Sequence, residues 1–141
     1  DYRVPLGGPP ASIFGLNIPP GWGLNLYSYI TSGEAYTPRD SEGRQSGEDY
    51  SSNGPYETAV NMKLTKALRV GRDRTIELIL QGWNIFNRRN ATEVDPQTGE
   101  PYTPGVGTMV QRDSEFYRIL YSNPAYWGAP RTFRLAVAYE W

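Results

Sequence analysis

The sequence has no cysteine and no histidine. The chain therefore cannot form disulfides or use a thiolate, and it lacks the commonest general base and zinc ligand. Its formal net charge is −1 and no basic cluster is interleaved with aromatic residues, so we expect no nucleic-acid partner. No run of residues approaches the ~18 apolar residues of a membrane helix. No pair of carboxylates has an evident partner for acid–base catalysis, so we expect a protein that is not an enzyme, and nothing indicates a metal or a cofactor.

What the sequence does contain favours β-structure. The 15 glycines and 12 prolines indicate many turns, and the 11 tyrosines and 4 tryptophans are typical of strands and interfaces. No stretch keeps a 3.6-residue apolar period, so we expect little helix. The 141 residues fit one domain. Because the chain begins at Asp1, without a methionine or a signal peptide, we expect a processed product or a piece of a longer protein.

Alternating apolar and polar residues predict strands near residues 22–32, 57–70, 74–87 and 131–141, with a partial strand over residues 11–17. The last strand has the clearest pattern, because one of its faces carries only large apolar side chains: Phe133, Leu135, Val137, Tyr139 and Trp141. The opposite face of that strand is small or polar. Each strand is about ten residues long, and this is the length that a tilted strand needs to cross a bilayer.

The connections between these strands alternate in length. Short turns at residues 17–21 and 71–73 alternate with long loops at residues 32–56 and 88–130, and we expect Val70 to pair with Arg74 across the second turn. Outer-membrane barrels have this asymmetry, with short periplasmic turns and long extracellular loops. We therefore predict an all-β fold, an antiparallel up-and-down meander of four to five strands in which residues 1–141 form one segment of a transmembrane β-barrel. Trp22 and Trp141 would then share the periplasmic interfacial girdle.

This orientation gives the candidate site residues. The polar faces of the strands would line the lumen, where side chains either contact a ligand or fill the wall: Asn25, Tyr27, Tyr29, Lys63, Glu77, Gln81 and Arg134. Tyr126 and Trp127 precede the last strand on the extracellular side, where they could contact a ligand or pack in the outer girdle. The acidic loop with Asp40, Glu42, Glu48 and Asp49 is either a calcium site or a solvated loop.

Four stretches resemble one family. They are residues 61–66 (Asn-Met-Lys-Leu-Thr-Lys), residues 82–87 (Gly-Trp-Asn-Ile-Phe-Asn), residues 123–131 with their Pro-Arg entry to the last strand, and the terminal alternation ending on Trp141. Together they resemble the C-terminal part of TonB-dependent outer-membrane receptors, including the branch with a carboxypeptidase-regulatory-like N-terminal domain.

The resemblance implies a location in the bacterial outer membrane and a larger barrel with an internal plug, which binds and takes up scarce ligands. Energy would come from the inner membrane through TonB-type coupling that uses N-terminal regions absent from this chain. The implied partners are the lipid bilayer and the outer-membrane assembly machinery. That machinery would read the terminal strand through Phe133, Leu135, Val137, Tyr139 and Trp141.

Four or five strands cannot close a membrane barrel, which needs about eight. We therefore expect the edges of this segment to pair with further barrel strands outside the chain. Two alternatives stay open. In the first, the chain is a cleaved β-rich fragment whose copies pair edge to edge into an oligomer or filament. In the second, it is a soluble β-sandwich that binds carbohydrate on its aromatic residues. These hypotheses differ in what the apolar face contacts. In a membrane barrel it faces lipid, and in a soluble sandwich it packs into a protein core.

Overall fold

The computed structural model describes residues 1–13, 15–71, 73–102, 115, 119 and 123–141. These residues fold into strands and one short 3-10 turn, so the protein is all-β. In the described part of the chain no helix is long and apolar enough to cross a bilayer. The chain divides into two compact units, described separately below. The sheet unit contains Asp1–Ser28, Ala59–Arg88 and Pro130–Trp141, and the loop unit contains Tyr29–Thr58 and Arg89–Ala129.

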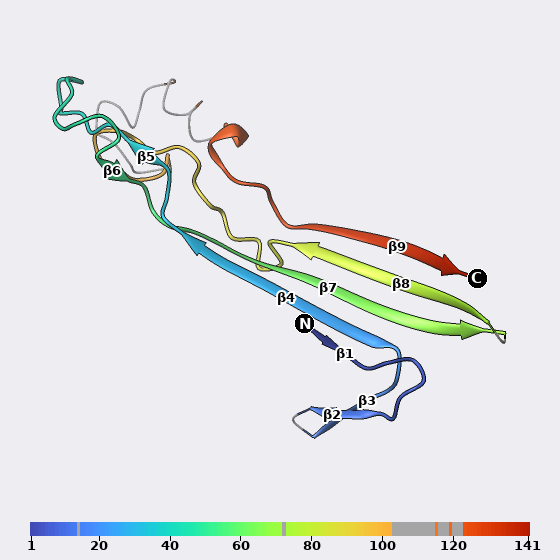
Figure 1. Cartoon of the computed structure of the whole chain (residues 1–141). Helices are drawn as coiled ribbons and strands as arrows, with labels where there is room; N and C mark the ends of the chain where they lie inside the picture. The colour runs from blue at the N-terminus through green and yellow to red at the C-terminus, as the bar shows by residue number, and fades with distance from the viewer. Residues whose placement is uncertain (14, 72, 103–114, 116–118, 120–122) are drawn as a thin grey trace. The chain divides into compact units, whose positions relative to one another are not determined.

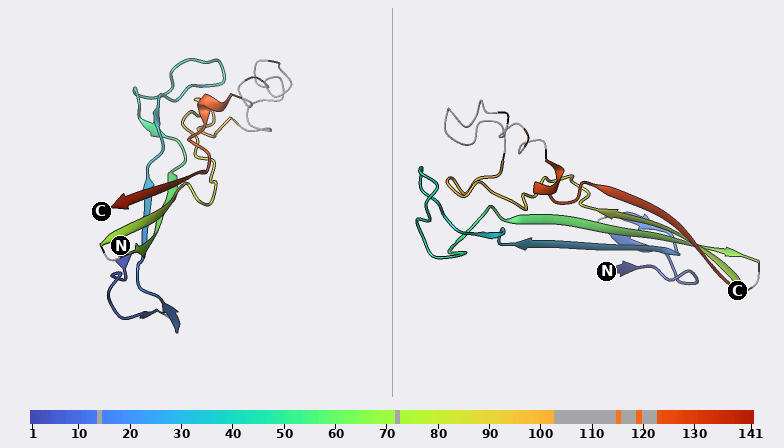
Figure 2. Two further views of the ribbon diagram at one scale, coloured as in Figure 1. Left: turned by 90° about the vertical axis from the view of Figure 1, so that its right-hand side faces the viewer. Right: turned by 90° about the horizontal axis from the view of Figure 1, so that it is seen from above.

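The sheet unit is built on a five-stranded sheet in the order β1-β4-β7-β8-β9 (Figure 1). Its strands are β1 (Tyr2–Arg3), β4 (Trp22–Thr31), β7 (Glu57–Val70), β8 (Arg74–Trp83) and β9 (Thr132–Glu140), of which β4 and β7 continue into the loop unit. The antiparallel pairing confirms the predicted meander for the last four of these strands. The sheet twists along its length, as expected for L-residues (Figure 2).

The register of the sheet follows the predicted hairpin. Val70 pairs with Arg74 across the turn, where Gly71 has the positive φ of 79° that a tight turn requires. From there the pairing continues through Leu64 opposite Leu80, and Leu80 opposite Leu135. Since side chains alternate along every strand, this register gathers the apolar positions of β7, β8 and β9 on one face.

The strand predicted for residues 74–87 ends earlier, at Trp83. Asn84 has a φ of 49°, which is incompatible with an extended strand. Its side-chain amide donates to the Arg88 carbonyl at 2.9 Å and accepts from the Arg88 N–H at 2.9 Å. Asn87, with a φ of 53°, accepts a hydrogen bond from the Arg131 N–H at 3.0 Å. The motif at residues 82–87 is therefore a turn that ends β8 and fixes the entry to β9.

The N-terminal prediction was wrong in one respect. Residues 11–17 do not form the tail of a strand in the main sheet. They form a separate hairpin of β2 (Ala11–Ile13) and β3 (Leu16–Ile18), turned at Gly15 with a φ of 79°. The position beside β4 is taken by β1, with Tyr2 opposite Leu24. The consecutive prolines at residues 9 and 10 lack N–H donors, which prevents a continuous ladder from β1 into β2.

Little of the apolar surface of the sheet unit is buried. Val4 and Ala59 are its buried hydrophobic residues among those described. In contrast, Leu135 is 81% exposed and Val137 is 68% exposed. The sheet is also open within the described residues, because β1 and β9 each have a neighbour on one side. One face of the sheet is therefore apolar and uncovered.

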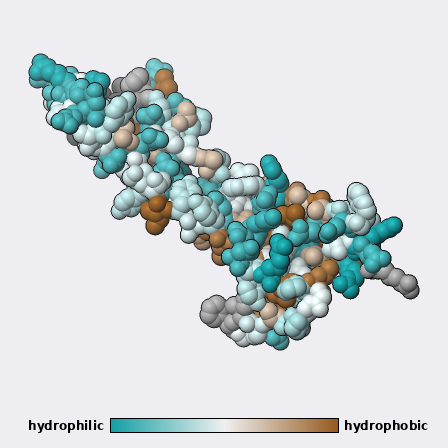
Figure 3. Space-filling model, viewed as in Figure 1, coloured by the Kyte–Doolittle hydropathy of each residue, from teal (hydrophilic) through white to brown (hydrophobic). Residues whose placement is uncertain are grey.

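The loop unit has short ladders and many side-chain contacts to the backbone. β5 (Ala35–Tyr36) pairs with β6 (Ser52–Asn53), and a 3-10 turn, η1, spans Pro124–Tyr126. Figure 3 shows the residues between β5 and β6 as almost uniformly hydrophilic. Hydrogen bonds from side chains, described below, hold the long connections in place.

Candidate functional surfaces

The polar face of the sheet brings several of the predicted lumen residues into one row. Lys63 pairs with Gln81, and Gln81 pairs with Arg134, so the three side chains lie side by side across β7, β8 and β9. Asn25 of β4 lines a hollow of about 150 Å³ together with Lys63. The Arg134 guanidinium also lies 5.5 Å from the centre of the Trp83 ring. This row combines two cations with two amides, a set that can hydrogen-bond to anions, hydroxyls or water.

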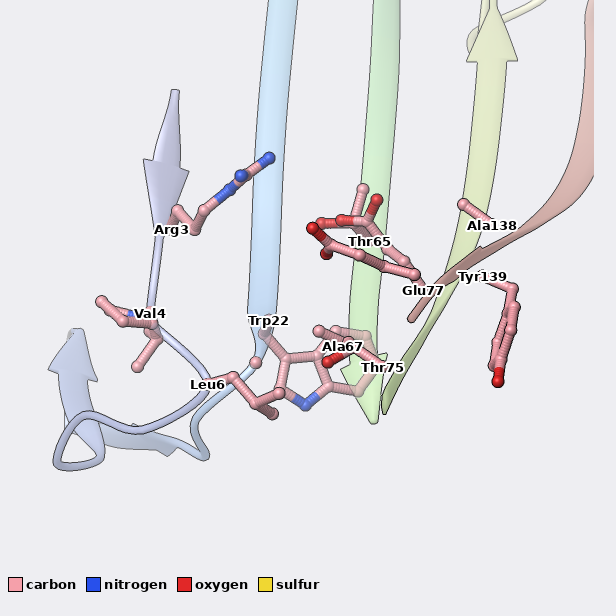
Figure 4. A pocket seen from close by; sticks show the side chains of 13 residues that line it. Arg3, Val4, Leu6, Trp22, Thr65, Ala67, Thr75, Glu77, Ala138 and Tyr139 are labelled. Carbon is pink, nitrogen blue, oxygen red and sulfur yellow. The ribbon is translucent and has the colours of Figure 1, made fainter. Parts of the chain in front are cut away.

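Glu77 lies outside this row, nearer the hairpin end of the same face. It pairs with Ala67 and Ala138 and lines a hollow of about 460 Å³ that the N-terminal segment helps to enclose. Figure 4 shows the Arg3 guanidinium reaching from β1 across β4, and the Glu77 carboxylate reaching from β8 toward Thr65. The hollow therefore presents a cation and a carboxylate from opposite sides.

Gly23 allows this close arrangement. A Cβ at Gly23 would lie 2.5 Å from Thr65 Oγ1, so a larger residue would displace the Thr65 side chain, and it would touch Arg3 Nε at 3.5 Å. Arg3 was not among the predicted residues. The first 21 residues have no clear alternation, and no sequence signal places Arg3 next to β4.

Tyr27 and Tyr29 occupy alternate positions of β4, as the strand pattern predicts. The Tyr27 side chain is 60% exposed, and Tyr29 is half-buried. Each ring has an apolar body and a polar hydroxyl at its tip, so each side chain is amphipathic.

The apolar face contains a shallow groove of about 430 Å³. Its side chains come from four strands: Trp22, Leu64, Lys66, Leu78, Leu80, Leu135 and Val137. Lys66 is the one charged residue of this lining. Its Nζ donates to the Pro20 carbonyl at 2.9 Å and lies 5.1 Å from the centre of the Trp22 ring. The aliphatic stem thus stays with the apolar surface while the ammonium reaches a polar backbone group.

Charge is distributed unequally between the two faces. Among the strand residues that belong to the sheet unit, the carboxylates are Glu77 and Glu140, and both lie on the polar face. The apolar face of these strands carries two charges, Lys66 and Arg74, and both are positive. Past the other end of the sheet, the Arg131 guanidinium lies 5.8 Å from the centre of the Phe133 ring. Cations therefore occur at both ends of the apolar face.

β9 presents the residues predicted as an assembly signal. Phe133, Leu135, Val137, Tyr139 and Trp141 are all exposed, and the Tyr139 and Trp141 rings contact each other at 5.8 Å between centres. β8 is the neighbour of β9 on one side. On the other side, no described residue pairs with the β9 backbone. Such an edge is a template for another strand.

The predicted ligand contacts of the loop unit, Tyr126 and Trp127, pack against neighbours. The Arg89 guanidinium lies 4.2 Å from the centre of the Trp127 ring, and the Tyr126 ring centre lies 5.3 Å from that of Tyr102. The indole N–H of Trp127 is buried without a hydrogen-bond partner among the described residues. Burial, together with the nearby charge of Asp95, raises the pKa of Tyr102 to about 12. These aromatic side chains therefore pack within the loop unit and stabilise it.

The acidic loop uses its carboxylates for turns. Asp40 Oδ1 accepts hydrogen bonds from the Glu42 and Arg44 N–H groups, both at 2.9 Å. Asp49 accepts from the Gln45 amide at 2.9 Å. No group of three or more acidic side chains converges on a metal position in the part of the chain that is described.

Three comparisons with known proteins complete the description of these surfaces. No protein-family model, no curated protein and no solved structure matches this chain.

Proposed function

We propose that this chain is part of the wall of a transmembrane β-barrel in the bacterial outer membrane, within a TonB-dependent receptor that binds and imports a ligand. The observation that carries the proposal is the uncovered apolar face. Leu78 of β8 is 43% exposed, and Leu135 and Val137, midway along the edge strand β9, are 81% and 68% exposed. In water such a surface associates or aggregates, whereas in a bilayer it is the lipid-facing wall.

The charge distribution supports the same proposal. A hydrated lumen accommodates charges of both signs, as found on the face with Lys63, Glu77 and Arg134. A lipid-facing surface excludes charge at mid-depth but accepts cations and aromatic rings at the interfaces. Lys66 beside Trp22, and Arg131 beside Phe133, are cations paired with aromatic rings, the combination that suits an interface.

In this proposal the turn at Gly71 is periplasmic, and the loop unit belongs to the extracellular side. Both exposed sheet edges pair with barrel strands that are not in this chain, and β9 serves as the element that the assembly machinery recognises. Tyr126 and Trp127 are then the candidate ligand contacts outside, and Asn25, Tyr27, Tyr29, Lys63, Glu77, Gln81 and Arg134 face the lumen.

Single-cysteine labelling tests the orientation of the two faces. The chain has no cysteine, so Leu135→Cys and Ala136→Cys each introduce one thiol, on opposite faces of β9. In intact membranes we expect a water-soluble maleimide to modify Ala136→Cys and to leave Leu135→Cys unmodified. Both variants should react after solubilisation. Equal labelling of the two variants in membranes, or a folded monodisperse protein without detergent, contradicts the proposal.

A second candidate function rests on the β9 edge. An exposed edge next to an apolar face also permits copies of the chain to pair into an oligomer or filament outside the membrane. Sedimentation in detergent-free buffer separates the two candidates, because filaments would pellet without lipid. A carbohydrate-binding sandwich is disfavoured, since among the described residues no second sheet packs on the apolar face.

A further inference from the structure

We propose that the groove on the apolar face binds one anionic phospholipid, with its phosphate on Lys66 and an acyl chain along Leu64, Leu80 and Leu135. This inference rests on the proposed function, because it places the groove in the bilayer. It adds a specific lipid site midway along β8 and β9 to a surface that would otherwise be uniform.

The groove has the chemistry of an acyl chain along most of its length. Its volume of about 430 Å³ is bounded by leucine and valine side chains from β7, β8 and β9. No strand carboxylate of the sheet unit projects into this face. A flexible hydrocarbon chain is the occupant that such an apolar surface accepts without leaving a polar group unpaired.

Lys66 supplies the polar end of the site. An ammonium has three N–H donors, and the Pro20 carbonyl takes one of them at 2.9 Å. The Trp22 ring, whose centre lies 5.1 Å from Nζ, holds the ammonium in place by a cation–π contact. Two donors are left for phosphate oxygens where Lys66 borders the groove. Arg74 lies on the same face and nearer the hairpin, where a second cation favours an anionic headgroup over a zwitterionic one.

This assignment selects a phospholipid rather than another amphiphile by complementarity of charge and shape. The groove end carries positive charge alone, and the adjacent Trp22 ring is suited to the depth of the headgroup. A peptide would leave backbone groups unpaired on the leucine surface. The acyl chain matches the leucine and valine surface of the groove, and the phosphate matches the Lys66 ammonium.

Native mass spectrometry of the full-length protein in detergent tests the proposal. The protein is offered equal amounts of phosphatidylglycerol and phosphatidylcholine of identical chains. We expect the wild type to retain phosphatidylglycerol preferentially, and Lys66→Gln to lower that preference about fivefold, the effect of one interfacial cation. Lys66→Arg should keep the preference. Arg69→Gln removes a cation from the same end of β7 but from the opposite face, and it should retain the lipid as the wild type does.

Two results would overturn the lipid site. The first is equal retention of the two lipids by the wild type, and the second is an unchanged preference in Lys66→Gln. Should Lys66→Gln fail to fold, the wild-type preference and the retention by Lys66→Arg and Arg69→Gln decide the matter. Membrane fractionation of the same samples separates the two proposals. A correctly inserted protein without lipid preference contradicts the lipid site alone, whereas a wild type absent from the membrane contradicts the proposed function.

Discussion

In the sheet unit, backbone pairs with backbone over nine consecutive residue pairs between β8 and β9, and over nine more between β7 and β8. In the loop unit the β5–β6 ladder has two residue pairs. Side-chain amides and carboxylates there supply hydrogen bonds to the backbone. Asn90 donates to the Thr58 carbonyl at 2.9 Å and accepts from the Thr58 N–H at 3.1 Å. Asp95, 1% exposed, accepts from the Gln97 N–H at 2.8 Å.

This difference has a physical consequence. A ladder is specified by alternation and does not depend on any one side chain, so the sheet unit tolerates substitution wherever the face keeps its character. A loop held by buried polar side chains depends on each of them, because removing one leaves unpaired backbone groups. The two units should therefore respond to different substitutions, and the predictions below test this contrast in order of expected effect.

The largest effect is expected from a charge on the apolar face of the sheet unit. Leu80→Arg should destabilise the membrane-inserted protein by ~2–4 kcal/mol, because the side chain would lie near the middle of the bilayer. The neighbouring Gln81→Arg, on the polar face, should change stability little. Urea-dependent folding into lipid vesicles measures both. Similar losses for the two variants would mean that the faces do not differ in environment.

In the loop unit the largest loss of stability should come from removing an uncharged side chain, the amide of Asn90. Asn90→Ala should destabilise the unit by ~1–3 kcal/mol, because both backbone groups of Thr58 lose their partner while Asn90 is 8% exposed. Hydrogen exchange at the Thr58 amide is the direct measurement. Asn53→Ala, an exposed amide on β6, is the matched control and should leave exchange unchanged. Slow exchange in Asn90→Ala would show that the amide bridge is dispensable.

A smaller effect is expected at the terminus of the sheet unit. Deleting Trp141 should lower the amount of folded protein in the membrane without changing synthesis, since the chain loses its exposed terminal aromatic and its contact with Tyr139. The loss of stability should be on the order of 1 kcal/mol, the scale of one aromatic pair. Trp141→Tyr, which keeps an aromatic ring, is the control. Pulse-chase labelling with a folding-sensitive gel shift measures the outcome, and unchanged insertion after deletion would reduce Trp141 to an interfacial residue.

The smallest effect concerns pH and the aromatic cluster of the loop unit. The pKa of Tyr102 is raised from 10.0 to about 12, so folding favours the neutral phenol. The corresponding stability is fully present below pH 10 and is lost as the pH rises through about 12. The ultraviolet absorbance of tyrosinate, compared between the wild type and Tyr102→Phe, should reveal one late-titrating tyrosine. A difference curve centred on the ordinary value of 10.0 would show that Tyr102 is not shielded.

The alternation of residues determined much of the sheet unit. The bounds of β4, β7 and β9 and the pairing of Val70 with Arg74 agree with the prediction to within one or two residues, because a period of two is a local property of an extended chain. The same alternation placed Lys63, Gln81 and Arg134 on one face, although the row that they form needed the register.

Tertiary structure alone decided which segments lie beside one another. Nothing in the first residues indicates that Tyr2 pairs with Leu24 or that Arg3 lines the same hollow as Glu77, because both placements depend on a chain reversal around a separate hairpin. β8 ends before Asn84 because Asn84 forms hydrogen bonds with the Asn61 side chain and the Arg88 backbone. The alternation of residues does not encode these bonds. Local periodicity specifies the direction of each side chain, whereas long-range pairing selects its neighbours. Alternation alone therefore places Lys66 on the apolar face of β7, but only the tertiary structure brings it to Pro20 and Trp22.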